Sequence, residues 1–253
     1  MKLPKLPFET PRLLPTGLWA EVERFAARRQ GKGVGRSSCK SEVRQCASLL
    51  RRTPETVLDV GANVGDYSAA VLDRFPRTTI HAFEPSPEAA ARLKGRFAGS
   101  KNVFVHEIAA SDAAGPVTLW SDRGGSGLAS LTKRRLDHFG IPFEHRTEVQ
   151  SDRLDRIMER LGVDRIDWLK LDVEGHELSV LRGMGDRIKE VQLVQFEFGG
   201  CNIDTRTYFQ DFWYFLRGHG FAVHRLTGSG PLEIGRYRES HESFCTTNYA
   251  AVR

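Results

Sequence analysis

Hydrophobic and polar positions in this chain follow two spacings, one typical of strands and one typical of helices. From residue 56 onward, short apolar runs are separated by segments in which apolar residues recur every three or four positions. Such runs predict buried strands, and the wider recurrence predicts amphipathic helices. Because the two kinds of segment alternate, we expect a doubly wound, parallel α/β sheet. The predicted strands cover residues 56–60, 79–83, 103–108, 168–171, 193–198, 221–226 and 248–252.

Three of the predicted helices have well-defined apolar faces. We expect Ser151 or Asp152 to cap the second of them, because short polar side chains accept hydrogen bonds from free N–H groups at a helix start. The third face is aromatic, and we interpret it as core rather than as a ligand site. The faces consist of Ala89, Ala90, Leu93 and Phe97; of Leu154, Ile157, Met158 and Leu161; and of Phe209, Phe212, Trp213 and Leu216.

A long insertion interrupts the alternation between the third strand and Trp168. Within it, residues 116–120 predict a further strand, and residues 124–130 form a segment rich in glycine and serine. Long loops inside a compact domain are usually functional or disordered. We therefore expect residues 124–130 to be a mobile loop near the ligand crevice.

The first 53 residues differ from the rest of the chain. A proline-rich start is followed by two stretches of helical spacing, around residues 18–26 and 43–50. The glycine-rich segment 31–35 between them lacks a preceding strand and a G-K-[ST] ending, so we interpret it as a connector rather than a phosphate loop. We predict a helical appendage or lid over residues 1–53 and one catalytic domain over residues 54–253.

Composition and charge are those of an ordinary globular protein. The chain of 253 residues carries a formal net charge of +5. Its basic clusters at 28–29, 51–52 and 133–135 are short, so we interpret them as solvated surface rather than a nucleic-acid interface. The four cysteines lack C-x-x-C spacing, which argues against a zinc cluster and fits a reduced, cytoplasmic protein. We expect no membrane span and no signal peptide, because apolar runs are short and prolines interrupt the N-terminal one.

A glycine turn after the first strand carries the main functional signal. The strand ends at Asp59, and the turn contains Gly61 and Gly65, with Asn63 where a dinucleotide-binding turn has its middle glycine. Glycines permit unusual backbone angles and close approach to a ligand. Asp59 is suited to a ligand ammonium or to anchoring the turn, and the helix start near Tyr67 is suited to a carboxylate. An amino-acid moiety such as that of S-adenosylmethionine would match this pairing.

A second carboxylate ends the next strand. Glu84 follows Asp59 by 25 positions, and Pro85 stops the strand directly after it. In parallel α/β sheets, ligands bind at the carboxyl ends of the strands. We therefore predict that Glu84 binds two ribose hydroxyls.

Titratable residues are concentrated after the strand at 168–171. Asp172, Glu174, His176 and Glu177 lie within six positions, and Glu197 ends the following strand. Such a cluster at a strand end is typical of a reaction site. His176 is the best general-base candidate by its ordinary pKa. The acids with His176 would also suit a divalent cation.

Three of these motifs together resemble the FkbM-type class I methyltransferase family. They are residues 59–65, 83–87 and 170–177, and the similarity extends over residues 54–253. The resemblance implies a mostly parallel seven-stranded sheet with an antiparallel last strand, and S-adenosylmethionine-dependent methylation of a hydroxyl on a sugar, glycan or polyketide-like product.

The resemblance also implies roles for individual positions. Glu84 would hold the ribose, Ala110 would border the adenine, and Asp172 would face the methyl group. The residues carried over for the methionine half and the rest of the cofactor site are Asp59, Gly61, Ala62, Asn63, Gly65, Tyr67 and Pro85.

Our leading hypothesis is transfer of a methyl group from S-adenosylmethionine to the hydroxyl of a small molecule or glycan. His176 or Asp172 would remove the hydroxyl proton, with Glu174 and Glu197 orienting the acceptor. One alternative is an RNA methyltransferase, which the basic charge favours and the lack of an N-P-P-[YF] motif opposes. A second is a non-catalytic scaffold, opposed by the complete cofactor set. A third, a nicotinamide dehydrogenase, is disfavoured by the glycine spacing. The sequence makes no prediction of oligomeric state.

Overall fold

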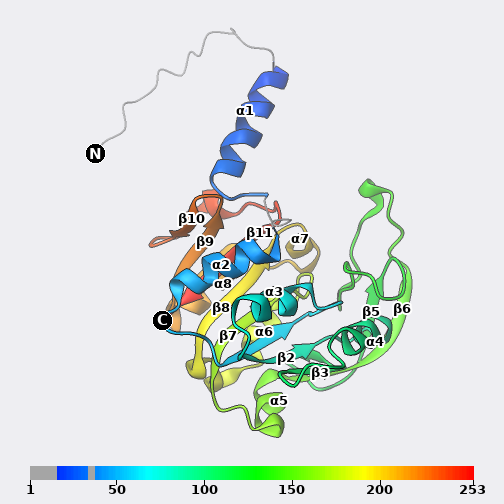
Figure 1. Ribbon diagram of the computed structural model, residues 1–253. Helices are drawn as coiled ribbons and strands as arrows, with labels where there is room; N and C mark the ends of the chain where they lie inside the picture. Colours follow the sequence, from blue (N-terminus) through cyan, green and yellow to red (C-terminus); the bar gives the residue numbers. More distant parts are fainter. Residues whose placement is uncertain (1–15, 34–37) are drawn as a thin grey trace.

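A large, mostly parallel sheet forms the centre of the molecule. The computed structural model describes residues 16–33 and 38–253 (Figure 1). The strands β3, β2, β1, β7 and β8 run parallel, and β11 is antiparallel to both of its neighbours, β8 and β9. In spatial order the strands are β10 (Gly230–Glu233), β9 (Ala222–Thr227), β11 (Thr247–Val252), β8 (Val191–Phe198), β7 (Ile166–Leu171), β1 (Thr56–Val60), β2 (Thr79–Phe83) and β3 (Val103–His106).

This topology confirms the predicted fold class. The predicted antiparallel last strand is β11, and the sheet contains one strand more than the seven expected. The extra strand, β10, forms an antiparallel hairpin with β9 at the sheet edge. Its sequence contains glycine and proline and is largely exposed, so it has no apolar run that would mark it as a strand.

Helices cover both faces of this sheet, and each face has its own apolar core. Alternate side chains of one strand enter opposite cores, so that Val57 and Leu58 of β1 pack on different faces. One core contains helices α2 (Cys39–Leu49), α3 (Asp66–Arg74) and α4 (Pro87–Arg96). The other contains α5 (Leu154–Leu161), α6 (Glu177–Arg182) and α8 (Phe209–Gly218). The aromatic stripe of α8 is core, as expected.

A second, three-stranded sheet lies beside the first, in the order β4–β6–β5 (Figure 1). The expected strand at residues 116–120 lies within β5 (Gly115–Ser121), while β4 (Ala109–Ser111) and β6 (His145–Arg153) were not expected. The predicted cap of α5 was wrong. Ser151 and Asp152 belong to β6, and Arg153 is the N-cap residue. The remaining short elements are η1 (Asp137–Phe139), η2 (Gly185–Glu190), α7 (Cys201–Thr205) and η3 (Glu239–His241).

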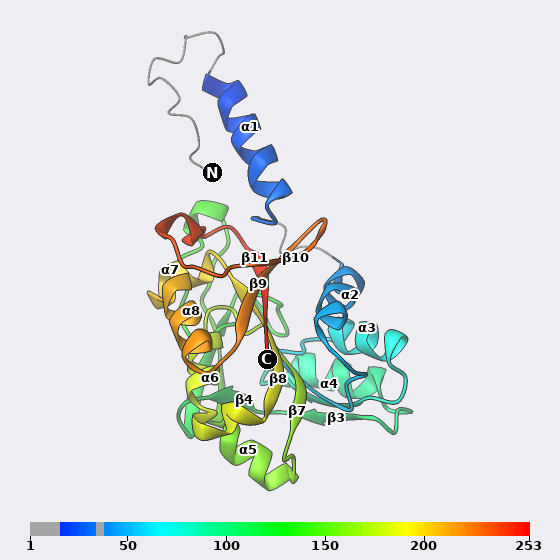
Figure 2. The same cartoon turned by 90° about the vertical axis from the view of Figure 1, so that its left-hand side faces the viewer.

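The described parts of the N-terminal segment behave differently from each other. Helix α1 (Thr16–Arg29) projects from the body and exposes Trp19 and Phe25 (Figures 1 and 2). Helix α2 instead buries Val43 and Cys46 in the core against the sheet. The division between residues 1–53 and 54–253 stays a prediction. Within the described ranges, none of the helices combines the length and apolar character needed to cross a membrane.

Candidate active site

The glycine turn between β1 and α3 brings the backbone close to the end of β7. Gly61 has a φ of 82°, and a Cβ atom there would stand 1.9 Å from the backbone oxygen of Asp172. The N–H groups of Gly61 and Ala62 donate to the carbonyl of Phe83, at 2.9 and 3.0 Å. Gly65, with a φ of 85°, is the N-cap residue of α3 and packs against α4. The turn therefore needs glycine at both positions.

Glu84 is held by the backbone of two turns. Its Oε2 accepts the N–H of Asn63 and its Oε1 accepts the N–H of Ser86, each at 2.8 Å. Burial raises the pKa of Glu84, and the two backbone hydrogen bonds oppose that rise. Each carboxylate oxygen has a second lone pair, and Glu84 lines the central cavity. The side chain is thus fixed in place and still able to accept hydrogen bonds from a ligand.

Asp59 and Tyr67 lie beneath the turn and brace it. Asp59 accepts the hydroxyl of Ser68 at 2.6 Å, and its burial raises its pKa to about 6. The hydroxyl of Tyr67 donates to Gln195. The carboxylate of Asp59 contacts α3 and is not among the residues that line the central cavity, an arrangement that favours the anchoring role, while its part in cofactor binding stays a prediction.

A cavity of about 190 Å³ lies at the carboxyl ends of β1, β2, β7 and β8. The loop at 124–130 contributes Ser126, Gly127 and Ser130 to its wall, so the expected position beside the crevice is observed. Ile108, at the end of the predicted third strand, and Leu119 from the insertion add apolar surface that we had not predicted. The predicted site residues in the wall are Gly61, Asn63, Glu84, Pro85, Ala110, Asp172, Glu174, His176 and Glu197.

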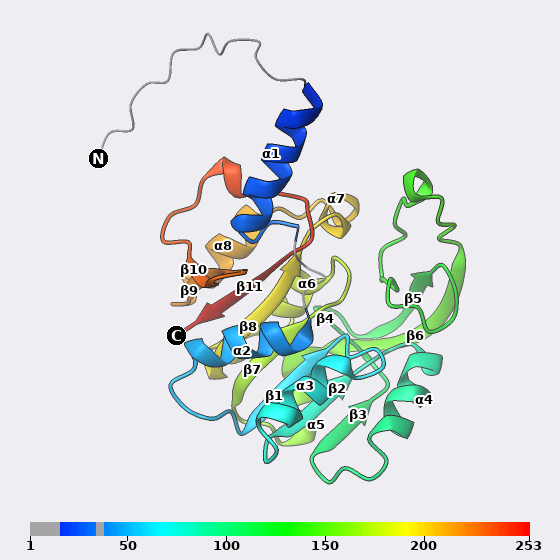
Figure 3. The ribbon, with the colours of Figure 1, turned by 45° about the horizontal axis from the view of Figure 1, so that its top comes forward.

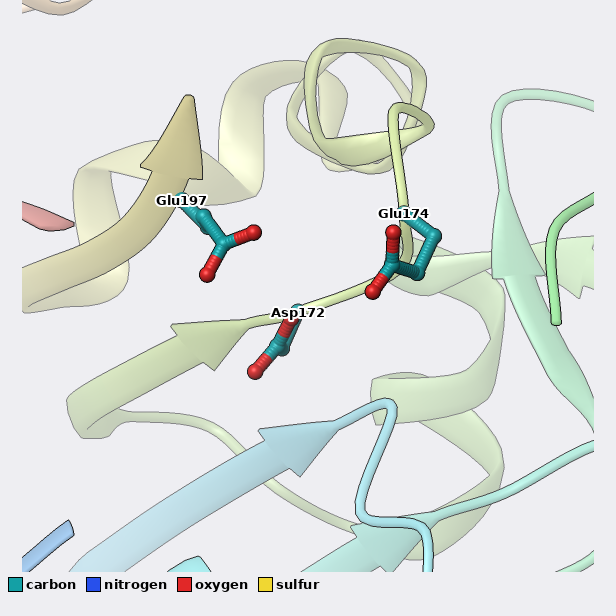
Figure 4. A group of neighbouring side chains, drawn as sticks. All are labelled: Asp172, Glu174 and Glu197. Atoms are coloured by element: carbon teal, nitrogen blue, oxygen red, sulfur yellow. The ribbon is translucent and has the colours of Figure 1, made fainter. Parts of the chain in front are cut away.

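Three carboxylates converge beside this cavity (Figure 4). Asp172, Glu174 and Glu197 each direct a carboxylate oxygen to within 4.8 Å of the others. Burial, and then the charge of Asp172, raise the pKa of Glu174 to about 7, although Arg134 opposes the shift. Burial and the neighbouring acids also raise the pKa of Glu197 well above its ordinary value. At neutral pH the cluster therefore carries fewer than three negative charges.

Two cations that the sequence did not single out stand at either side of the acids. Lys170 Nζ lies 3.0 Å from Asp172 Oδ2, with only 2% of the residue exposed. Burial alone would lower the pKa of Lys170, but the surrounding carboxylates raise it. On the other side, Arg134 pairs with Glu174 and with Asp204. The interpretation of residues 133–135 as solvated surface was wrong for Arg134, whose side chain is 10% exposed.

Spacing could have revealed Lys170. Residues two apart in a strand share a face, so a lysine two positions before Asp172 lies beside it. For Arg134 no such signal exists, because it reaches Glu174 from a loop forty positions away.

His176 is hydrogen-bonded to Ser111, which is in turn hydrogen-bonded to Asp112. Its Nε2 lies 3.1 Å from the hydroxyl of Ser111, which donates to Asp112 Oδ1 at 3.2 Å. With that donation, Ser111 accepts from Nε2–H, and Nδ1 carries the free lone pair. Burial lowers the pKa of His176, so the ring is neutral at pH 7. It can accept a proton at Nδ1.

Glu177, by contrast, is a structural residue. It is fully buried, and its Oε1 accepts the N–H groups of Val173 and Gly175, at 3.0 and 3.2 Å. These bonds close the turn after β7 that carries Glu174. Burial raises the pKa of Glu177 to about 7.

A divalent cation at the acids stays a prediction. Hard cations prefer oxygen ligands, and the three carboxylates are close enough to share one. Lys170 and Arg134 already neutralise two of them, which lowers the charge available to a metal ion.

Comparison with known proteins adds an independent line of information. The model of the methyltransferase FkbM domain matches residues 59–223. The chain is 26% identical over 200 residues to the 2-O-methyltransferase NoeI of Sinorhizobium fredii, covering 75% of this chain and 82% of the relative. It is 29% identical over 216 residues to the 31-O-demethyl-FK506 methyltransferase FkbM of Streptomyces tacrolimicus, covering 73% and 78%.

The chain is also similar to a hexuronic acid methyltransferase and to a solved FkbM structure. Identity is 25% over 184 residues with the hexuronic acid methyltransferase AglP of Haloferax volcanii, covering 69% of this chain and 71% of the relative. The crystal structure of methyltransferase FkbM from Methylobacillus flagellatus matches with a TM-score of 0.52 at 18% identity, covering 83% of this chain. The match spans 47% of that chain, about half of it, so this likeness concerns the fold.

Proposed function

Because the chain belongs to the FkbM methyltransferase family, we propose that it methylates a hydroxyl group of a sugar, glycan or other natural product, with S-adenosylmethionine as the cofactor. The family expected from the sequence motifs is confirmed, and with it the assignment as a methyltransferase. The observation that carries the proposal is Glu84, a carboxylate fixed by two backbone N–H groups in the wall of the central cavity.

The residues present fit this cofactor. S-adenosylmethionine, when bound, supplies a methyl group on a positively charged sulfur, which makes the methyl carbon electrophilic. Glu84 retains lone pairs for the two ribose hydroxyls, and Gly61 leaves no side chain between the turn and the end of β7. Ala110 and Pro85 supply the cavity wall for the adenine, and Asn63 supplies wall for the methionine half.

The proton on the acceptor hydroxyl must leave as the new bond to oxygen forms, and His176 is our choice as the base. Its Nδ1 is free to accept, and Asp112 stabilises the charged ring through its electrostatic field. Asp172 is the second candidate, and its carboxylate already accepts a hydrogen bond from Lys170. Glu174 and Glu197 would accept hydrogen bonds from neighbouring hydroxyls of the acceptor.

Support for the acceptor class comes from the relatives. Two of the three names give a position of O-methylation, and the third names a hexuronic acid. A surface lined with carboxylates and hydroxyl groups suits a ligand rich in hydroxyls. We further propose a cytoplasmic location, because all four cysteines are free thiols.

Calorimetric titration with S-adenosylhomocysteine tests the cofactor site. We expect the unmodified protein to bind and Glu84→Ala to lose binding, while Glu159→Ala, an exposed acid on α5, leaves affinity unchanged. Equal affinity of all three proteins would contradict the assignment of Glu84.

The base is tested with a hydroxyl acceptor found by screening sugars and natural products for incorporation of a labelled methyl group. We expect His176→Ala to lower kcat by roughly 10²–10⁴-fold with unchanged affinity for S-adenosylhomocysteine. A variant with normal kcat would remove His176 from the mechanism.

A further inference from the structure

We propose that the protein binds a phosphoryl group, as free phosphate or as part of a phosphorylated small molecule, in a second cavity at the β9–β10 edge of the sheet. We call it the basic cavity and define it by Lys32, Arg225, Arg236, Arg238 and His241, which line it. The segment after α1, the hairpin β9–β10 and the chain leading to η3 meet there (Figures 1 and 3).

Arg225 is the central observation. It projects from β9 with 4% of the residue exposed, and its Nε and Nη2 make no hydrogen bond of normal geometry with the described residues. The guanidinium also interacts with the Tyr249 hydroxyl, where it opposes the rise in pKa that burial causes. Nη1 donates to the carbonyl of Gln30 at 3.3 Å, and the guanidinium lies 5.7 Å from the ring of Tyr249. A buried donor without a partner is costly, and more so when it is charged. An anion with several oxygens would satisfy these donors, since the planar guanidinium matches phosphate geometry.

The other cations of the basic cavity also lack a counter-charge. Among residues 16–33 and 38–253, Lys32, Arg225, Arg236 and Arg238 form no ion pair with a carboxylate. Lys32 donates instead to the carbonyl of Ser240, at 3.0 Å. The single acidic residue in the described wall, Glu233, is exposed.

The cations of the basic cavity repel each other. Burial, and then the charge of Arg225, lower the pKa of Lys32. Burial and the charges of Arg225, Lys32 and Arg238 lower the pKa of His241, although Glu242 opposes the shift. A bound anion would relieve this repulsion.

Size and charge point to a phosphorylated molecule. Four permanent cations and a histidine exceed what one carboxylate would neutralise, whereas a phosphate monoester carries nearly two charges at pH 7. The cavity has a volume of about 410 Å³, which leaves room for a group attached to the phosphate.

The basic cavity is separate from the active site. Asn248 lines a recess beside Glu197, whereas the next residue, Tyr249, lies against Arg225. Because adjacent residues of a strand point to opposite faces, β11 stands between the two sites. The ligand would join the segment at residues 30–32, which precedes α2, to the sheet edge.

Calorimetry in phosphate-free buffer tests the proposal with two probes, inorganic phosphate and a hexose monophosphate. Arg236→Gln combined with Arg238→Gln removes two exposed cations, and Arg77→Gln combined with Lys101→Gln removes the same charge elsewhere on the surface. We expect binding by the unmodified protein and the control, and at least about tenfold weaker binding by the first pair. Arg225→Gln should bind neither probe if it folds.

The comparison of probes identifies the source of the phosphoryl group. Tighter binding of the hexose monophosphate indicates a phosphorylated metabolite, and equal binding indicates the free anion. Absence of binding for both probes, or equal weakening by the two double variants, would overturn the proposal.

The indole of Trp213 reports where the probe binds. Its Nε1–H donates to the carbonyl of Ile234, a wall residue of the basic cavity, at 3.1 Å. In ¹H–¹⁵N spectra we expect the Trp213 signal, assigned with Trp213→Phe, to shift on addition of phosphate, while the buried Trp168 in β7 stays constant. Binding that shifts Trp168 and leaves Trp213 unmoved would place the anion elsewhere and overturn the proposal.

Discussion

The two halves of the sheet's carboxyl edge hold their acidic side chains in different ways. On the β1–β2 half, both oxygens of Glu84 accept backbone N–H groups. On the β7–β8 half, Asp172, Glu174 and Glu197 face one another, and two cations compensate them: Lys170 in β7 and Arg134 from a distant loop. We call the β1–β2 half the geometric half, because it depends on local backbone geometry and keeps its shape when charges change. We call the β7–β8 half the charge-balanced half, because its protonation state depends on its charge balance and so follows pH and substrate.

We expect the largest loss of stability and of cofactor affinity from a substitution in the glycine turn of the geometric half. Gly61→Ala would place a methyl group 1.9 Å from the backbone oxygen of Asp172, at a φ of 82°. The free energy of unfolding should fall by about 3 kcal/mol, and affinity for S-adenosylhomocysteine should be lost. Urea denaturation and calorimetry measure the two.

Gly95→Ala is the matched control. It lies in α4 with no atom within 4 Å of the added methyl group, so we expect a gain of roughly 0.5–1 kcal/mol in stability. If Gly61→Ala behaved like this control, the turn would not be fixed by the close approach to β7.

Lys170→Met removes a positive charge from the charge-balanced half. It leaves Asp172 and Glu197 without their buried cation, and the free energy of unfolding should fall by about 3 kcal/mol at pH 8. The loss should be smaller at pH 6, where Glu197, whose pKa is raised by burial and by neighbouring acids, takes up a proton more readily. Lys40→Met, which removes an exposed pair with Asp73, should cost less than about 1 kcal/mol. Similar losses for both variants would contradict the charge-balance account.

Two substitutions of Glu177 separate the contribution of its hydrogen bonds to stability from the contribution of its charge. Glu177→Ala leaves the N–H groups of Val173 and Gly175 unpaired and should cost about 2 kcal/mol. Glu177→Gln keeps the accepting oxygen and removes the charge. The folded pKa of about 7 exceeds the ordinary value of 4.5, so the folded state binds more protons between these pH values.

The sign of the resulting pH dependence follows from that excess of bound protons. Glu177 lowers stability progressively as pH rises from about 4.5 to about 7, and the loss persists above pH 7. The free energy of unfolding of the unmodified protein, minus that of Glu177→Gln, should therefore be larger at pH 5 than at pH 8. Urea denaturation of both proteins at the two pH values checks this, and parallel stability curves would refute it.

The smallest effect is a displacement of the acid limb of the pH–rate profile. With His176 as base, kcat/KM should decline below pH 6.5, because burial lowers the pKa of this ring. With Glu174 as the base, the decline should begin near pH 7. If kcat/KM of His176→Ala still declined below about pH 7, Glu174 rather than His176 would be the general base.

The geometric half was predictable from the sequence because its contacts are short in range. Asp59, the glycine turn and Glu84 lie within 26 residues, and each follows an apolar strand. The same regularity identified every parallel strand of the large sheet. The sequence therefore predicted that Glu84 lies at the end of the second strand, but it did not predict the hydrogen bonds that Glu84 accepts from Asn63 and Ser86.

The charge-balanced half was only partly predictable. The acids were found, but their cationic partners were not: the spacing of Lys170 from Asp172 was a usable signal, whereas Arg134 lies in a loop and has no local signal. Strand β6 was missed because its sequence is mostly polar and only a few of its residues are buried. The core packing of α2, which lies in the predicted appendage, was not foreseen, because contacts such as that of Cys46 with Gln195, 149 positions later, leave no mark in the local pattern.

The place of β11 has a consequence for how the protein is made. This strand comes after all the other strands in the chain, yet it lies between β8 and β9 in the sheet. While the ribosome is still adding residues 247–252, the edges of β8 and β9 have no partner between them and can pair with other chains. The segment bearing Glu197 gains its neighbour Asn248 only when β11 inserts between β8 and β9. The part of the cavity wall that Glu197 supplies is therefore completed by a segment that the ribosome makes after every other strand of the sheet.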